Sequence, residues 1–170
     1  MKKIFIIGMS GSGKSTLAKQ ISNILKIPVF ELDDIFWIKK YTKQKSDDNC
    51  LIELKKHLKE NDSWIVEGVY DWAKIAADKA DLVISLNYGI NTATYRIIKR
   101  WFFNKRKNNE TIKELYGLIK YQRAYKKVRP NKIYSTYEKH KSVISGNEHK
   151  LIEIKTKKDL KKLIEKLKIN

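Results

Sequence analysis

The chain has 170 residues, of which 37 are lysine or arginine and 19 aspartate or glutamate, so its formal net charge is +18 at pH 7. This length suits one domain with its own core, and one cysteine with three scattered histidines gives neither a disulfide pair nor metal-ligand spacing. No apolar stretch approaches the roughly 20 residues of a membrane span, so we expect a cytoplasmic protein with no membrane partner.

The first predicted element is a strand over residues 2–7, an apolar run rich in isoleucine that ends in glycine. Because the run stops at Gly8, it is too short to be the apolar core of a signal peptide. A helix is predicted next over residues 14–26, where apolar residues recur at helical spacing until Pro28 ends the pattern.

A phosphate-binding pattern joins these two elements. The segment Gly8-Met9-Ser10-Gly11-Ser12-Gly13-Lys14-Ser15 matches G-x-x-x-x-G-K-[ST], between a strand and a helix as this pattern requires. We expect the loop amides and the helix N-terminus to bind phosphate, Lys14 to reach the β- and γ-phosphates, and Ser15 to bind Mg²⁺. Thr16 is expected either to pack within the helix or to contact a phosphate. The cofactors predicted are ATP and Mg²⁺, although the sequence does not distinguish ATP from GTP.

Carboxylates end the next strands. A strand over residues 28–32 is followed by Asp33 and Asp34, a helix is predicted over 48–59, and a strand over 64–67 ends in Glu67 before Gly68. A phosphate loop needs a carboxylate on a neighbouring strand to order Mg²⁺. Glu67 is the candidate for the metal and Asp33 for the phosphoryl acceptor, whereas Asp34 is expected to be a bystander. A helix cap or a solvated loop charge is the alternative for each.

Further strands are predicted over residues 81–86 and 151–155, with a final helix over 156–168. The intervening stretch of about 60 residues is too long for a loop. Helical spacing over 90–102 and 112–125 indicates at least two helices there. The pattern predicts an α/β fold, a three-layer P-loop NTPase with a five-stranded parallel sheet, helices on both faces and a helical lid insertion. We expect one domain over 1–170, with the lid at about 102–130.

The arginines are confined to one part of the chain, in contrast to the lysines. The chain has 32 lysines spread throughout but five arginines, all between positions 96 and 129: Arg96, Arg100, Arg106, Arg123 and Arg129. Guanidinium groups recognise phosphate in a planar, bidentate way that lysine cannot reproduce. Arg96 and Arg100 share a helix face, where pairing with acidic neighbours is the alternative. The lysine excess indicates either a polyanion partner or an AT-rich genome.

Several segments together resemble a known family. The phosphate loop, Leu32-Asp33 with Phe36-Trp37, Trp64-Ile65-Val66-Glu67-Gly68-Val69-Tyr70, Ala80-Asp81-Leu82-Val83-Ile84, and Arg96 with Arg100 resemble the bacterial "DNA topology modulation protein" group. That group is similar to the adenylate-kinase-like P-loop kinases, and the resemblance covers roughly residues 4–130 of this sequence.

The resemblance implies roles for particular residues. Lys14 and Ser15 take the phosphate and Mg²⁺ roles, Asp33 faces the acceptor, and Arg96 with Arg100 corresponds to the arginine pair that clamps phosphates at the base of a lid. The sequence departs from the family pattern at Glu67, where aspartate is usual, and at Val69, where asparagine is usual.

Three functions remain open from the sequence. The first is a kinase in which the lid brings Arg96, Arg100, Arg123 and Arg129 onto the transferring group, the acceptor being a small molecule or nucleotide that offers a hydroxyl or a phosphate. The second is a nucleic-acid-linked NTPase, indicated by aromatic residues among basic ones at Trp101, Phe102, Phe103, Tyr116, Tyr121 and Tyr125, although such residues at helical spacing are usually core. The third is a nucleotide-binding module without turnover. The sequence leaves the oligomeric state open.

Overall fold

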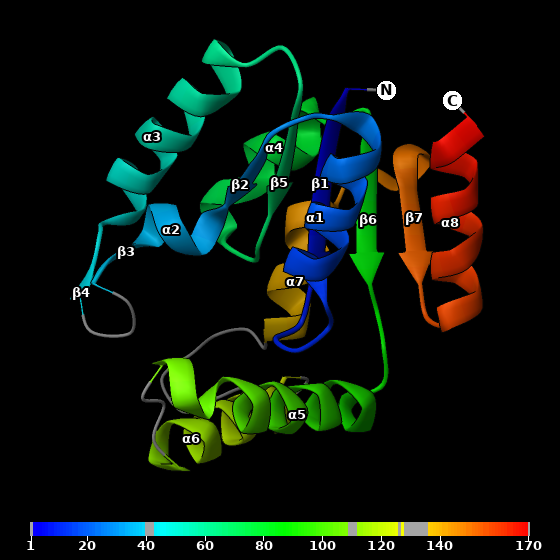
Figure 1. The fold of residues 1–170 in the computed structure, drawn as a ribbon. Coiled ribbons are helices and arrows are strands. Elements are labelled where there is room, and N and C mark those ends of the chain that lie inside the picture. Colours follow the sequence, from blue (N-terminus) through cyan, green and yellow to red (C-terminus); the bar gives the residue numbers. More distant parts are fainter. Residues whose placement is uncertain (1, 40–42, 109–111, 126, 128–135, 170) are drawn as a thin grey trace.

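A five-stranded parallel sheet forms the centre of the computed structural model, which describes residues 2–39, 43–108, 112–125, 127 and 136–169 (Figure 1). The strand order is β2-β5-β1-β6-β7, and every neighbouring pair in this sheet is parallel. The bounds are β1 Lys3–Gly8, β2 Val29–Glu31, β5 Trp64–Glu67, β6 Leu82–Leu86 and β7 Leu151–Ile154. The predicted fold class is therefore confirmed, and β1 takes the central position.

Helices cover both faces of the sheet, because its strands carry apolar side chains on both faces. Helices α1 (Lys14–Leu25) and α8 (Lys157–Ile169) pack on one face. Helices α3 (Asp47–Glu60), α4 (Lys74–Lys79) and α7 (Thr136–Ile144) pack on the other. The predicted helices over 14–26, 48–59 and 156–168 correspond to α1, α3 and α8.

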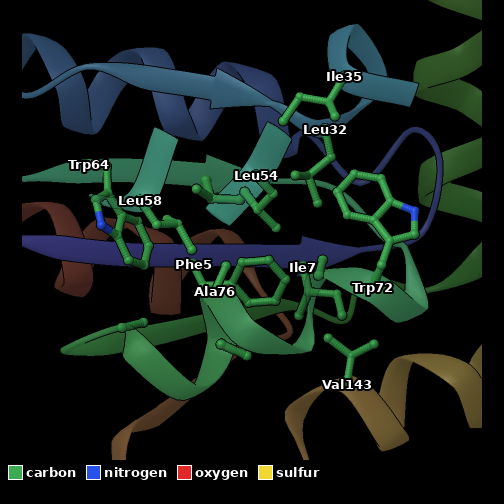
Figure 2. Packing of buried hydrophobic residues seen from close by; sticks show 14 of the residues in the cluster. Phe5, Ile7, Leu32, Ile35, Leu54, Leu58, Trp64, Trp72, Ala76 and Val143 are labelled. Carbon is green, nitrogen blue, oxygen red and sulfur yellow. The ribbon is translucent and has the colours of Figure 1, made fainter. Parts of the chain in front are cut away.

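Two apolar clusters lie on either side of the sheet. Ile4 and Ile6 of β1 join the cluster beneath α1 and α8, whereas Phe5 and Ile7 join the cluster beneath α3, α4 and α7. Figure 2 shows the second cluster, in which Leu54 of α3 and Val143 of α7 reach toward the strands. These residues are buried, so the central strand is held on both faces.

Several short elements were not predicted. They are α2 (Leu32–Phe36), β3 (Trp37–Lys39), β4 (Lys43–Gln44), η1 (Asp71–Ala73), α4, α7 and η2 (Glu148–Lys150). Strands β3 and β4 form a separate antiparallel pair beside α2. Asp33 consequently stands in the first turn of a short helix and not in a loop.

Two helices follow β6 and lie across the end of the sheet where β1 and β6 finish (Figure 1). They are α5 (Ile90–Asn108) and α6 (Ile112–Arg123), which pack against each other as a helical hairpin. Position 102, the expected start of the lid, falls inside the continuous helix α5. Within the described residues, no helix has the length and apolar character needed to cross a membrane.

Candidate functional site

The segment Gly8–Ser15 leaves the end of β1 and enters α1, which begins at Lys14. Gly13, the residue that caps this helix, has a φ of 97°, and Gly11 has a φ of 74°, a region that side chains rarely adopt. A Cβ at Gly11 would also come within 2.6 Å of the Ala93 carbonyl oxygen of α5. Glycine is therefore required at both positions, and the loop lies directly against α5.

The interior of this loop contains a polar group without a partner. Ser12 is 1% exposed, and its Oγ has no hydrogen-bond partner in the described part of the chain. A buried, unsatisfied hydroxyl is costly, so an oxygen-rich ligand in the loop would satisfy it. The first amides of α1 also lack helical partners and carry the positive end of the helix dipole. Both features fit a phosphate.

Ser15 and Glu67 meet where β1 and β5 lie side by side. The Ser15 hydroxyl donates a hydrogen bond of 2.5 Å to Glu67 Oε1. Glu67 is 5% exposed, and this burial raises the pKa of its carboxyl group, an effect that the nearby charge of Lys14 partly offsets. No cluster of three histidine, cysteine, aspartate or glutamate side chains that could hold a metal occurs among the described residues. The Ser15 hydroxyl and the Glu67 carboxylate are nevertheless oxygen ligands of the kind that bind Mg²⁺ beside phosphates.

Lys14 and Thr16 flank Ser15 on the first turn of α1. Lys14 is partly buried, and its Nζ lies 3.5 Å from the Met9 carbonyl oxygen, across the loop. Thr16 is exposed, so of its two expected positions the structure does not show packing within the helix. Its side chain faces solvent because the buried face of α1 consists of Leu17, Ala18 and Ile21.

Arg96 of α5 reaches the loop. Its Nη1 donates a hydrogen bond of 2.6 Å to the Ser12 carbonyl oxygen, and its guanidinium carbon lies 4.2 Å from the centre of the Tyr88 ring. Arg100 is exposed one turn further along α5, and Arg123 is exposed on α6. Of Arg96, Arg100 and Arg123, Arg96 alone is brought onto the phosphate loop. The side chain of Arg106, and all of Arg129, lie outside the described residues.

Asp33 lies in the first turn of α2, which directly follows the carboxyl end of β2. The Tyr70 hydroxyl donates a hydrogen bond of 2.7 Å to Asp33 Oδ1, and burial together with this carboxylate raises the pKa of Tyr70. The Tyr70 ring lies 4.6 Å from that of Phe36 and is stacked on Trp72 at 5.0 Å between ring centres. Asp34 is exposed, in accord with the role of bystander.

The two ends of the α5–α6 hairpin meet at Met9 of the phosphate loop. Gln122, buried near the end of α6, accepts a hydrogen bond of 2.7 Å from Thr94 of α5 and lies 3.5 Å from Met9 Sδ. Tyr125 is buried against Met9 as well, and its hydroxyl lies 2.5 Å from Nδ1 of His140 on α7. Burial lowers the pKa of His140 to about 3, so this ring is neutral.

Sequence reasoning did not identify Gln122, Trp72 or His140. A lone glutamine or histidine in a helix carries no pattern that separates a buried bridge from a surface residue. Tyr70 stood in a segment that the sequence analysis singled out, but its contact with Asp33 depends on the turn of α2.

Comparison with known proteins gives one family-model match and one curated relative. The model of the NB-ARC domain, a P-loop NTPase domain, matches residues 1–79, which include the phosphate loop and Glu67. The uncharacterized protein YqaC of Bacillus subtilis (strain 168) is 32% identical over 124 residues, which are 72% of this chain and 67% of that protein.

Solved structures with similar folds include two kinases. A gluconokinase from Sinorhizobium meliloti 1021 superposes with a TM-score of 0.59 at 14% identity, covering 99% of this chain and 90% of its own. A protein from Eubacterium ventriosum ATCC 27560 gives 0.56 at 15% identity, covering both chains completely. A sugar kinase from Janibacter sp. HTCC2649 gives 0.51 at 14% identity, covering 99% and 91%. At these identities the likeness concerns the fold, which is that of the P-loop NTPases.

Proposed function

The chain belongs to the family of the Bacillus subtilis protein YqaC, and we propose that it is an ATP-dependent phosphotransferase that acts on a small acceptor. The observation that carries this proposal is the Ser15–Glu67 contact of 2.5 Å beside a phosphate loop whose buried Ser12 hydroxyl has no partner among the described residues. The gluconokinase and sugar kinase of similar fold agree with a kinase. We place the reaction in the cytoplasm, where ATP is available.

In this proposal the loop binds the phosphates of ATP. The loop residues Gly8, Ser10, Gly11, Ser12 and Gly13 surround the β-phosphate, and the amino end of α1 adds its dipole. The Ser12 amide donates to the Met9 carbonyl oxygen at 3.1 Å, so Ser12 contributes its hydroxyl. Lys14, already directed across the loop, neutralises the β- and γ-phosphates. Thr16, exposed at the same helix end, is left to contact a phosphate.

Ser15 and Glu67 would hold Mg²⁺. The metal supplies charge that stabilises the phosphoryl group during transfer. Glu67 is suited to this role because its carboxylate is buried and points at a hydroxyl in the first turn of α1. Ser15 would hold the cation through its hydroxyl oxygen, and Glu67 would hold it through its carboxylate.

Arg96, Arg100 and Arg123 are proposed to neutralise the transferring group. Arg96 already lies on the loop backbone, whereas Arg100 and Arg123 reach it when the α5–α6 hairpin closes. Asp33, on the acceptor side, orients the attacking group and accepts its proton if that group is a hydroxyl. Little covalent chemistry is left for the protein, because phosphoryl transfer depends mainly on positioning and charge.

The test is Mg²⁺-dependent release of ADP by the purified protein with candidate acceptors. The Lys14→Ala substitution should abolish ADP release and leave the fold intact, since Lys14 contributes a charge and no core volume. Circular dichroism and thermal unfolding check the fold. Unchanged turnover in this variant would contradict the assignment of the loop, and ATP binding without any ADP release would favour a module without turnover.

A nucleic-acid partner is a second candidate, because one observation favours it. Residues of α5 and α6 expose large aromatic rings beside basic side chains, namely Tyr95, Phe102, Phe103, Tyr116 and Tyr121, whereas Trp101 and Tyr125 are buried. Exposed rings with cationic neighbours bind single-stranded bases by stacking. Affinity for single-stranded DNA that falls steeply with salt and survives Lys14→Ala would support this candidate. Absence of binding at low salt would refute it.

A further inference from the structure

Three carboxylates gather on the acceptor side of the candidate site. Glu31 and Glu67 are register neighbours at the carboxyl ends of β2 and β5, and Asp33 follows Glu31 by two residues. Glu31 and Glu67 therefore lie side by side on neighbouring strands, and Asp33 lies in the first turn of α2, which follows β2. By contrast, residues 28–73 contain no arginine at all.

Two lysines beside these carboxylates form ion pairs with acidic side chains. Lys19 lies 3.4 Å from Glu31, and Lys139 pairs with Asp71 beside Trp72. The arginine that reaches the phosphate loop, Arg96, comes instead from α5, on the nucleotide side. Within the part of the chain that the structure describes, a phosphate or carboxylate on the acceptor would therefore meet carboxylates without a guanidinium clamp.

Aromatic rings form the second component. The Tyr70 ring lies between two others, with its centre 4.6 Å from that of Phe36 and 5.0 Å from that of Trp72. The Tyr70 hydroxyl donates a hydrogen bond of 2.7 Å to Asp33. Ring edges and faces of this kind pack against the apolar C–H surface of a flat or ring-shaped ligand. A carboxylate next to them accepts hydrogen bonds from hydroxyl groups.

Trp72 adds an unpartnered donor. It is 8% exposed, and its Nε1 has no hydrogen-bond partner among the described residues. In Figure 2 the indole nitrogen points to the edge of the sheet at which the phosphate loop leaves β1. The nitrogen is covered in this conformation, so a ligand must displace a neighbouring side chain to reach it. One such neighbour is the partly buried Tyr70, which stacks on Trp72 and donates to Asp33.

Resting on the proposed function, we propose that the phosphoryl acceptor is an uncharged compound carrying hydroxyl groups on a ring. Asp33 accepts the hydrogen bond of the attacking hydroxyl, the Phe36–Tyr70–Trp72 rings contact the ring of the acceptor, and the Trp72 N–H donates to a second oxygen. In transfer, the hydroxyl oxygen forms a bond to the γ-phosphorus of ATP, the bond to the bridging oxygen of ADP breaks, and the hydroxyl proton passes to Asp33. A sugar and a nucleoside share this chemistry.

The experiment uses a small-molecule extract of Bacillus subtilis divided by anion exchange into an uncharged and an anionic fraction. The full chain is incubated with each fraction and ATP labelled at the γ-phosphate, and ATP·Mg²⁺ binding is measured separately by calorimetry. Label should pass to a compound of the uncharged fraction, and ultraviolet absorbance of the product distinguishes a nucleoside from a sugar. Transfer only in the anionic fraction would overturn this inference while supporting a kinase. Binding of ATP with no transfer in either fraction would overturn the proposed function itself.

A matched pair of variants tests Trp72. Trp64 is also buried with an unpartnered Nε1, but it lies at the opposite end of β5, so Trp64→Phe is the control for Trp72→Phe. Trp72→Phe should raise the KM of the acceptor roughly tenfold with an unchanged KM for ATP, because one hydrogen bond to the acceptor is lost. Trp64→Phe should lower the melting temperature and leave both KM values unchanged. Equal acceptor KM values in the two variants would refute the role of Trp72.

Discussion

The contact of Arg96 with the phosphate loop leads to a prediction with two readouts. The guanidinium donates to the Ser12 carbonyl oxygen at 2.6 Å and lies over the Tyr88 ring at 4.2 Å. A hydrogen bond from a charged donor contributes about 1.5–3 kcal/mol, and a partly desolvated cation–π contact about 1 kcal/mol. Arg96→Ala should therefore lower the free energy of unfolding by about 3 kcal/mol, which corresponds to a decrease in Tm of roughly 6–12 °C.

The conservative variant separates stability from catalysis. Arg96→Lys keeps the charge but loses the planar fork, so it should lower kcat roughly 10²–10³-fold with a smaller loss of stability. Urea unfolding and ADP release measure the two effects. Arg100→Ala is the control for stability, because Arg100 is exposed on the same helix. If Arg96→Ala and Arg100→Ala unfold at the same urea concentration, the loop contact does not stabilise the fold and the reasoning is refuted.

Two further predictions concern Gly13 and His140. Gly13→Ala should weaken ATP binding, because a residue with a side chain is about 1–2 kcal/mol less stable at a φ of 97° and the loop must distort. Calorimetry measures the affinity for ATP, and an unchanged affinity would contradict this prediction. The pKa of His140 is about 3 in the folded chain and 6.5 ordinarily, so between these values the unfolded chain binds more protons. The free energy of unfolding should therefore decrease as the pH falls through this window, by up to about 1.4 kcal/mol per pH unit. Urea unfolding of His140→Leu should lack that decrease, and an identical pH dependence would contradict the assignment.

The sheet and the phosphate loop are predictable from sequence because each rests on local signals. The buried strands are short apolar runs, and the loop has a pattern that few chains match by chance. The clustering of arginines also singled out Arg96, which the structure brings into contact with the phosphate loop. The roles of all the predicted site residues in binding and catalysis, those of Lys14, Ser15 and Arg96 included, remain predictions.

The acceptor side was less accessible to sequence reasoning. Helix α2 has five residues and β4 two, which is too short for a periodic signal. Helix α7 is nine residues long and follows a stretch without a strong apolar pattern. The aromatics of α5 divide by helix face, since Trp101 continues the buried row of Ala93 and Ile97 while Phe102 and Phe103 turn outward. Spacing alone did not separate these two groups.

Because both ends of the α5–α6 hairpin contact Met9, we expect any change in the position of the hairpin to change the shape of the phosphate loop as well. The apparent Kd for ATP then equals the intrinsic Kd divided by the fraction of molecules in the competent arrangement. Substitutions on the hairpin that change this fraction alter nucleotide affinity without changing any group that touches the nucleotide. The affinity of this chain can thus be adjusted on α5 and α6 while residues 8–15 stay the same.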